Sequence, residues 1–226
     1  MKIPLLLAAS LALTPLFAVE HNLAYPFASY FNSNVCDQVI NKDVLTICYD
    51  YNYKAALAVG YKLRGDRVSK SIEKRPQFYK EPALRGSYAA VYKDYTRSGY
   101  DRGHMAPDAS FDYSPTALNQ TYSMANIVAQ APTVNRRLWV KAEKYERQMA
   151  IKLGVADVLN VVVYPQVPKR IGSGVAVPSG FWKRVSSAEA GFERCFYYEN
   201  DLNANAKGDR LKDHVVECSQ LLGLGK

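Results

Sequence analysis

The stretch 133–153 predicts a long amphipathic helix, and this helix is the strongest constraint on the fold. Its apolar residues recur at i, i+4, i+7 and i+11 and so share one face: Leu138, Ala142, Tyr145 and Met149. Gly154 follows directly and is a natural helix end. Residues four apart form a second stripe on a different face: Asn135, Trp139, Glu143 and Arg147.

Most other ordered segments are rich in aliphatic residues and tyrosine, which is typical of strands. They are the stretches 44–50, 55–63, 159–164, 175–178, 181–185 and 192–198. Ser114 and Pro115 open a short helix over 114–119, while 88–95 is a short helix or a loop and 211–222 is a partly helical tail. No repeat or linker divides the chain, so we expect one α+β domain over 19–226.

The first 18 residues predict a secretory signal peptide. Lys2 precedes the apolar run 3–13, and Ala18 is a small residue at the expected cleavage point. The alternative is a membrane anchor, but the run is short for a spanning helix and Pro15 interrupts it. We therefore expect export to the periplasm or the medium, with no membrane association of the mature chain.

The chain has four cysteines, none of them in a Cys-x-x-Cys arrangement. In an oxidising compartment an even number of cysteines indicates disulfides rather than a metal site. Three pairings are possible. We favour the local pairing, Cys36–Cys48 and Cys195–Cys218, which closes a loop near each end of the chain.

The composition excludes a disordered or fibrous chain, since 48% of the 226 residues are hydrophobic and 22% are charged. The formal net charge of +8 favours polyanionic partners such as nucleic acid or an anionic membrane. Many exported proteins are basic without such a partner, so the charge needs a site to support it.

The octet 100–107 brings a carboxylate, a guanidinium and an imidazole together: Asp101, Arg102 and His104. Arginine holds phosphate with a planar fork of donors, and histidine moves a proton near neutral pH. Gly103 is expected to let the backbone turn before the histidine, and Pro107 ends any continuing helix. The alternative is a surface loop whose histidine has an ordinary hydrogen-bond partner.

This octet and the segments after it resemble the DNA/RNA non-specific endonucleases, the ββα-metal nucleases related to endonuclease G. The similarity extends from Ala55 to about Leu222, and its blocks follow the order of that family: 101–107, 123–130, 135–136, 139–143 and 177–183. Ala129 departs from the family, where proline usually precedes the glutamine. The resemblance implies an α+β fold with a central antiparallel sheet flanked by helices, and a ββα-metal element from the Asp101 motif to the Asn135 helix.

The resemblance implies that His104 is the general base and that Asn135 is the single protein ligand of Mg²⁺, with Mn²⁺ as an alternative ion. A base needs a pKa near the working pH, and Mg²⁺ keeps several waters and so needs few protein ligands. Glu143 would orient metal-bound water. Other readings are a helix N-cap for Asn135 and a Glu143–Arg147 pair along the helix, which is compatible with the catalytic role.

Three arginines are candidates for contact with the reacting phosphate. Arg102 and Arg147 match family arginines near the phosphate, and Arg75 is assigned to transition-state stabilisation. The register around Arg75 leaves Lys74 as an alternative.

Two residues are assigned support rather than chemistry. Asn126 matches a family position near the site, and Asp101 is expected to fix the loop or to pair with an arginine, not to bind metal. His21 and His214 lie outside the matching blocks and are expected to be solvated.

The resemblance therefore implies an exported, magnesium-dependent endonuclease that cuts DNA and RNA and leaves 5′-phosphates. Basic side chains are candidates for tracking the phosphate backbone without reading bases: Arg136, Arg137, Lys141 and Lys144. Two alternatives stay open, a nucleic-acid-binding protein without catalysis and a phosphodiesterase for small substrates.

Overall fold

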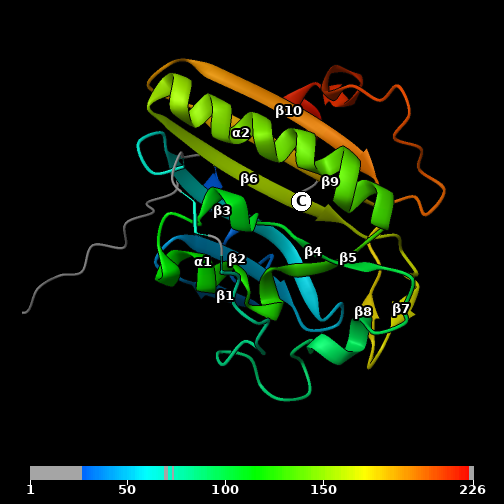
Figure 1. The fold of residues 1–226 in the computed structure, drawn as a ribbon. Coiled ribbons are helices and arrows are strands. Elements are labelled where there is room, and N and C mark those ends of the chain that lie inside the picture. The colour runs from blue at the N-terminus through cyan, green and yellow to red at the C-terminus, as the bar shows by residue number, and fades with distance from the viewer. Residues whose placement is uncertain (1–26, 69–70, 73, 224–226) are drawn as a thin grey trace, which may run out of the picture.

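The computed structural model describes residues 27–68, 71–72 and 74–223, and its centre is a seven-stranded sheet (Figure 1). The strands follow the order β1-β2-β3-β6-β9-β10-β11, and every neighbouring pair is antiparallel. Their bounds are β1 Gln38–Asn41, β2 Leu45–Asp50, β3 Ala55–Arg64, β6 Val155–Val163, β9 Gly180–Ser187, β10 Phe192–Glu199 and β11 Val215–Val216. The α+β class with a central antiparallel sheet is confirmed.

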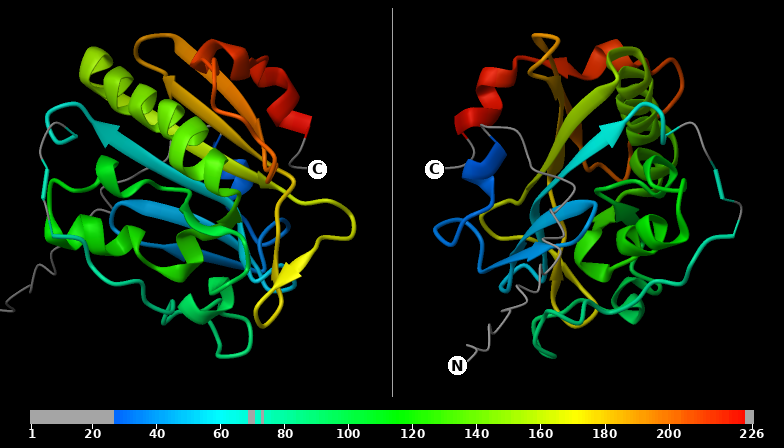
Figure 2. Two further views of the ribbon diagram at one scale, coloured as in Figure 1. Left: turned by 45° about the vertical axis from the view of Figure 1, so that its right-hand side comes forward. Right: turned by 90° about the vertical axis from the view of Figure 1, so that its left-hand side faces the viewer.

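Both faces of this sheet are covered. The helices α1 (Pro115–Thr121) and α2 (Trp139–Leu153) lie on one side, and α2 runs across β6, β9 and β10 (Figures 1 and 2). The 3₁₀ turns η1 (Phe27–Tyr30) and η7 (Cys218–Gly223) lie together on the other side (Figure 2). The hydroxyl of Tyr30 donates to the carbonyl of Leu221 at 2.8 Å and so joins the two described ends.

The central strand β6 shows the consequence of this double covering. Its sequence is apolar at most positions, and its seven inner residues are all buried. A strand covered on both faces forms a continuous apolar run rather than alternating with polar residues. One apolar cluster lies on the α2 side, and a second on the opposite side includes Phe27, Leu159, Trp182 and Leu221.

A smaller sheet carries the sequence octet. β4 (Asp101–His104) pairs with β5 (Ile127–Gln130), placing Asp101 opposite Gln130 and His104 opposite Ile127. The π-helical turn η5 (Val134–Leu138) and α2 follow β5, which gives the expected ββα arrangement. A third sheet pairs β7 (Arg170–Ile171) with β8 (Val175–Ala176), and the other 3₁₀ turns are η2 Tyr92–Tyr95, η3 Asp108–Ser110, η4 Met124–Asn126 and η6 Leu211–His214.

The predicted long helix is present, but it begins with the π-helical turn. Its apolar face is confirmed, because Leu138, Ala142 and Met149 are buried and Tyr145 packs against the core. Of the second stripe, Trp139, Glu143 and Arg147 lie in α2 and keep their four-residue spacing, and Trp139 is fully buried. Asn135 lies within the π turn, which holds more residues than an α turn, so its side chain does not keep that spacing with the other three.

The strands predicted from composition are present with shifted ends. β1, β7 and β11 were not predicted, and β4 and β5 were implied only by the family resemblance. All five have four residues or fewer, and β4 is mostly polar. Such short segments carry too few apolar residues for a period of two to emerge. In β4 and β5 the tertiary environment therefore decides the extended conformation.

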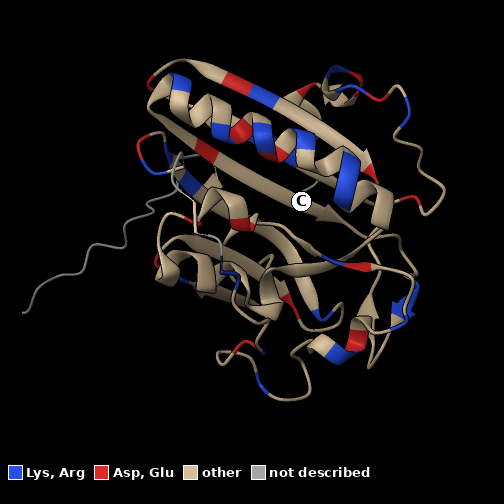
Figure 3. Ribbon diagram, viewed as in Figure 1, with Lys and Arg blue, Asp and Glu red and all other residues tan. Residues whose placement is uncertain are grey.

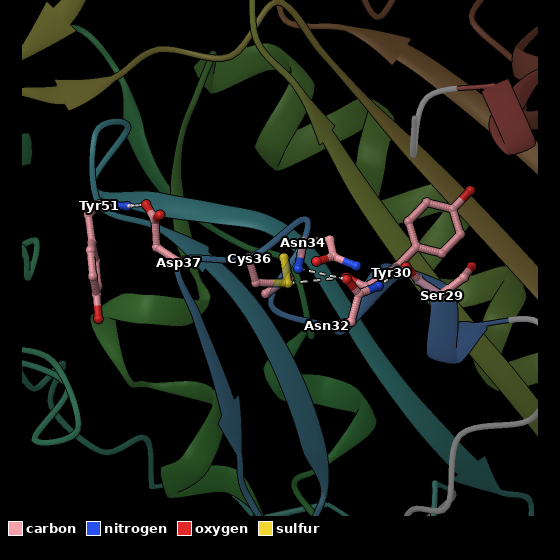
Figure 4. Close-up of a disulfide and its surroundings, with 8 residues drawn as sticks. Ser29, Tyr30, Asn32, Asn34, Cys36, Asp37 and Tyr51 are labelled. Atoms are coloured by element: carbon pink, nitrogen blue, oxygen red, sulfur yellow. Dashed lines mark hydrogen bonds between the residues drawn. A yellow bond between two sulfur atoms is a disulfide. The ribbon is translucent and has the colours of Figure 1, made fainter.

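The structure contains the disulfides Cys36–Cys48 and Cys195–Cys218. The first joins the segment before β1 to β2, and the second joins β10 to η7. Around Cys36, the backbone N–H of Asn34 donates to the Asn32 side chain at 2.9 Å, and Asp37 accepts from the N–H of Tyr51 at 2.7 Å (Figure 4). These bonds order the turn that presents Cys36.

The expected signal peptide, residues 1–18, lies outside the described residues. Within the described part of the chain, none of the helices combines the length and the apolar character that crossing a membrane requires.

Removing either disulfide should destabilise the fold. Replacing both cysteines of one pair by alanine is expected to lower the free energy of unfolding by about 2–4 kcal/mol, because the unfolded chain regains loop entropy. Urea titration measures the loss, and non-reducing peptide mapping tests the connectivity. Free thiols or crossed fragments in the oxidised protein would contradict this pairing.

Candidate active site

His104 is the last residue of β4. The sequence suggested a turn at Gly103, but Gly103 lies within this strand. Gly103 is extended and pairs with Val128 in β5. A side chain at Gly103 would place its Cβ 2.2 Å from Oε1 of Gln130. The glycine is therefore required by the close approach of Gln130 and not by a change in chain direction.

The imidazole of His104 is enclosed by aromatic rings. Its centroid lies 5.3 Å from that of Phe78 and 5.0 Å from that of Tyr122. The Nε2 atom is buried without a hydrogen-bond partner. Burial lowers the pKa of His104 to about 4, against the smaller opposing effect of Asp108. The ring is therefore neutral at physiological pH, and its pKa lies below the near-neutral value that is best for a general base.

Asp108 connects this histidine to Arg75. One of its carboxylate oxygens lies 3.1 Å from Nε of Arg75 and accepts a hydrogen bond from the hydroxyl of Tyr122 at 3.0 Å. Arg75 also pairs with Asp112 at 3.0 Å. Within the open register at 74–75, Arg75 is thus the residue that pairs with these carboxylates beside His104.

Asp101 joins the histidine strand to the π turn. Its carboxylate accepts from Nδ2 of Asn135 at 3.0 Å and from Nε and Nη2 of Arg136, both at 2.7 Å. Burial raises the pKa of Asp101, but the hydrogen bonds from Arg136 and Asn135 prevail and hold that pKa below its usual value. The ion pair between Asp101 and an arginine, one of the two expected roles, is present.

Glu143 and Arg147 lie farther along α2, both partly exposed. Burial raises the pKa of Glu143 to about 8, although Lys183 and Arg147 oppose the shift. The Arg147 guanidinium donates to the hydroxyl of Ser110 at 3.4 Å, in the 3₁₀ turn that follows the His104 motif. Arg147 therefore joins α2 to the segment that follows His104, while Asp101 joins β4 to the π turn.

Arg102 points toward η2. Its Nε and Nη2 donate to the carbonyl of Tyr92 at 3.3 and 2.8 Å, and its guanidinium lies 3.4 Å from the centre of the Tyr92 ring. A cavity lined by Gln77, Phe78 and Tyr92 lies on this side of the site.

Asn126 is fully buried and holds the loop that follows His104. Its Oδ1 accepts from the N–H of Ala106 at 2.8 Å, and its Nδ2 donates to the carbonyls of Ala106 at 2.9 Å and Thr121 at 2.8 Å. These are contacts of support, as expected for this position.

The residues of this site fit a metal that keeps most of its waters. The bond from Nδ2 of Asn135 to Asp101 orients the amide and leaves Oδ1 as the atom that can bind a cation. Among the described residues, no group of three or more His, Cys, Asp or Glu side chains could hold a metal ion. A hard cation with one amide oxygen and several waters, such as Mg²⁺, suits this donor set.

The basic residues expected to track phosphate differ in their pairing. Arg136 pairs with Asp101, and Lys141 forms an ion pair with Asp209. Arg137 and Lys144 are exposed, and several Lys and Arg positions lie along α2 (Figure 3). The two exposed residues are therefore the stronger candidates.

His214 is not simply solvated. Its Nε2 lies 2.6 Å from Asp209, and its ring stacks on Tyr198 with a centroid distance of 3.9 Å. It anchors the C-terminal segment. His21 lies outside the described residues.

The sequence analysis missed several polar residues around the site: Asp108, Ser110, Glu146, Asn160 and Lys183. Glu146 had a detectable signal, because it lies four residues after Ala142 on the apolar face of α2. A carboxylate at such a position needs a buried partner. Nothing in the sequence identified that partner, which is Lys183 on β9.

Glu143→Gln should change how stability depends on pH in EDTA. Because the folded-state pKa of about 8 exceeds the ordinary 4.5, the contribution of the protonated carboxyl is complete below pH 4.5 and is lost as the pH rises to about 8. Between these pH values, ionisation of Glu143 should lower the free energy of unfolding of the wild type by at most about 1.4 kcal/mol per pH unit. Urea titrations at pH 5 and 8 measure this fall.

The exposed Glu189 provides the matched control, since Glu189→Gln should keep the wild-type profile. The same fall in wild type and in Glu143→Gln would contradict the raised pKa of Glu143.

The sequence profile of the DNA/RNA non-specific endonuclease family matches residues 25–217. Human endonuclease G, mitochondrial, is 28% identical over 169 residues, which are 68% of this chain and 56% of that protein. Nuclease 1, mitochondrial, of Schizosaccharomyces pombe is 28% identical over 174 residues, 70% of this chain and 53% of the relative. The chain thus spans little more than half the length of these relatives.

The fold is also similar to that of a solved structure. A chain in the crystal structure of the EndoG/EndoGI complex matches with a TM-score of 0.74 over 83% of both chains, at 21% identity. The family profile covers most of the sequence, and the site residues lie within the matched region. The chain therefore belongs to the DNA/RNA non-specific endonuclease family.

Proposed function

We propose that this chain is an exported, Mg²⁺-dependent endonuclease that hydrolyses phosphodiester bonds of DNA and RNA without reading the base sequence. One observation carries the proposal: Asp101 begins the short strand that ends in the neutral His104, and its carboxylate accepts a hydrogen bond from the amide of Asn135 in the π turn. A proton acceptor and an oriented oxygen ligand are thus built into one ββα unit.

His104 is assigned as the general base. Because Nε2 is enclosed, we assign Nδ1 of the neutral ring to take a proton from water, and the resulting hydroxide attacks phosphorus. The bond between phosphorus and the 3′ oxygen then breaks, the 3′ oxygen takes a proton from water to become a hydroxyl, and the phosphate stays on the 5′ side.

Asn135 is assigned as the protein ligand of the metal, through Oδ1. A bound Mg²⁺ would stabilise negative charge on the leaving oxygen and on the phosphorus centre. Glu143 lies eight residues farther along the helical segment, and its carboxylate is assigned to orienting water beside the metal. Mn²⁺ could replace Mg²⁺, since both accept oxygen ligands.

The arginines are assigned to the charge of the substrate phosphate. Arg102 uses Nε and Nη2 on the Tyr92 carbonyl, so Nη1 is the group that we assign to phosphate. Arg147 is held toward the motif loop by Ser110. Arg75 pairs with Asp108, whose charge acts on His104, and we assign Arg75 to the same phosphate.

Export rests on the apolar N-terminal segment and on the two disulfides, which persist in oxidising compartments. The mature chain is proposed to act in the periplasm or outside the cell.

The test of function is cleavage of circular DNA and of RNA by the purified mature chain, with Mg²⁺ and with EDTA. Nicking and degradation of both polymers only with the metal would support the proposal. Binding without cleavage would favour an inactive nucleic-acid-binding protein, and hydrolysis of small diesters alone would favour a small-substrate phosphodiesterase.

His104→Ala should reduce cleavage by about 10²–10⁴-fold, because the general base is lost, while Mg²⁺ and DNA binding persist. Asn135→Ala should weaken metal binding and turnover together. Calorimetry with Mg²⁺ and single-turnover cleavage separate the two effects. His214→Ala is the matched control, since His214 anchors the C-terminal segment outside the site, and near-normal cleavage by His104→Ala would exclude the mechanism.

Affinity for nucleic acid should fall steeply with salt, because neutralised phosphates release counterions. Replacing the exposed Arg137 and Lys144 by alanine should lower affinity for all sequences alike and reduce the salt slope by up to about 0.9 per lost phosphate contact. Fluorescence anisotropy measures the slope. Lys152→Ala, at the far end of α2, should change neither quantity, and an unchanged slope in the double variant would show that these residues are only solvated surface.

A further inference from the structure

A charged cluster is buried between α2 and the sheet. Glu146 of α2 and Lys183 of β9 form an ion pair, and both side chains have 0% exposure. The hydroxyl of Tyr61, on β3, lies 3.0 and 2.9 Å from the two carboxylate oxygens of Glu146. Three elements of the fold therefore meet at one carboxylate.

The cluster reaches the loop that follows His104. Ser110 donates from its hydroxyl to Glu146 at 2.8 Å. Asn160 on β6 donates from Nδ2 to the hydroxyl of Tyr61 at 3.1 Å and to the carbonyl of Met105 at 2.7 Å. We name these five residues the Glu146 cluster: Tyr61, Ser110, Glu146, Asn160 and Lys183.

Its contacts touch both sides of the active site. Met105 directly follows His104, and Ser110 also accepts from Arg147, the residue after Glu146. The ammonium of Lys183 lies 4.7 Å from the ring centre of Trp139, which follows the π turn carrying Asn135. The cluster thus touches neighbours of the proposed base, of the proposed metal ligand and of a proposed phosphate arginine.

Stability alone gives little reason for such a cluster. Burying an ion pair costs desolvation free energy, and well-packed apolar residues of similar size are often as stable or more stable. A charged, hydrogen-bonded group does allow fewer alternative packings, since any displacement leaves a buried charge without its partner. The desolvation cost of the buried ion pair is therefore explained if the reaction needs the surrounding side chains in one fixed arrangement.

We propose that Glu146 and Lys183 are positioning residues for the nuclease reaction. They hold the His104 loop against α2, so that His104, Asn135 and Arg147 face one phosphate. This inference rests on the proposed function. Asp101 joins β4 to the π turn before α2. The Glu146 cluster joins the segment after β4 to α2 in the interior. A displacement of about 1 Å at a reacting group can cost about 100-fold in rate.

The test compares Glu146→Gln, Lys183→Met and the double variant with wild type. Each single variant should lose about 10- to 100-fold in kcat with little change in KM, because the groups that bind the polymer remain. Each also leaves one buried charge unpaired and should melt earlier. The double variant removes both charges and should recover much of the thermal stability without recovering kcat.

Asp157→Asn is the matched control. Asp157 pairs with Lys62 between the same two strands, β6 and β3, with no hydrogen bond to the His104 loop among the described residues. This variant should lower the melting temperature and leave kcat unchanged. Normal kcat in the double variant, or a loss of kcat in Asp157→Asn that matches its loss of stability, would overturn the positioning role.

A second readout does not depend on nuclease activity. If the cluster holds the His104 loop, its removal should let water reach the imidazole, and the pKa of His104 measured by NMR should rise toward 6.5 in the double variant. Asp157→Asn should leave that pKa unchanged. An inactive wild type would refute the proposed function, whereas an unchanged His104 pKa in the double variant would refute the positioning role.

Discussion

The carboxylate of Asp101 is the contact on which the site depends. β4 and the π turn before α2 are separate in sequence, and each is too short to define a geometry alone. Asp101 binds the side chains of Asn135 and Arg136 while its backbone pairs with Gln130 in β5. One residue therefore sets the orientation of the amide and its distance from the strand that ends in His104.

Burial shifts the pKa values of His104 and Glu143 in opposite directions. Burial disfavours charge, so it lowers the pKa of His104 and raises that of Glu143. Both side chains are neutral near pH 7 without a cation. In the proposed mechanism the imidazole accepts a proton, and a divalent cation beside Glu143 would favour the ionised form of that carboxyl.

Much of the framework was predictable because it follows from local patterns. The apolar stripe of α2 and the aliphatic, tyrosine-rich strands identified the main layers, and the octet 100–107 identified the His104 region. The π turn was not predictable, since nothing in 134–138 distinguishes it from an ordinary helical turn. Its effect is on Asn135, which lies inside the π turn and therefore does not keep α-helical spacing with Trp139, Glu143 and Arg147 in α2.

The sequence alone determined the family motif, the chemical types of the candidate residues and the α+β class, because these depend on residue identity and short-range periodicity. Only the tertiary structure decided that Gly103 is needed for the approach of Gln130, that Arg136 is occupied by Asp101, and that Glu146 meets Lys183. Each of these contacts joins residues 27 or more positions apart, and no local pattern encodes which distant side chains the folded sheet and helix bring together.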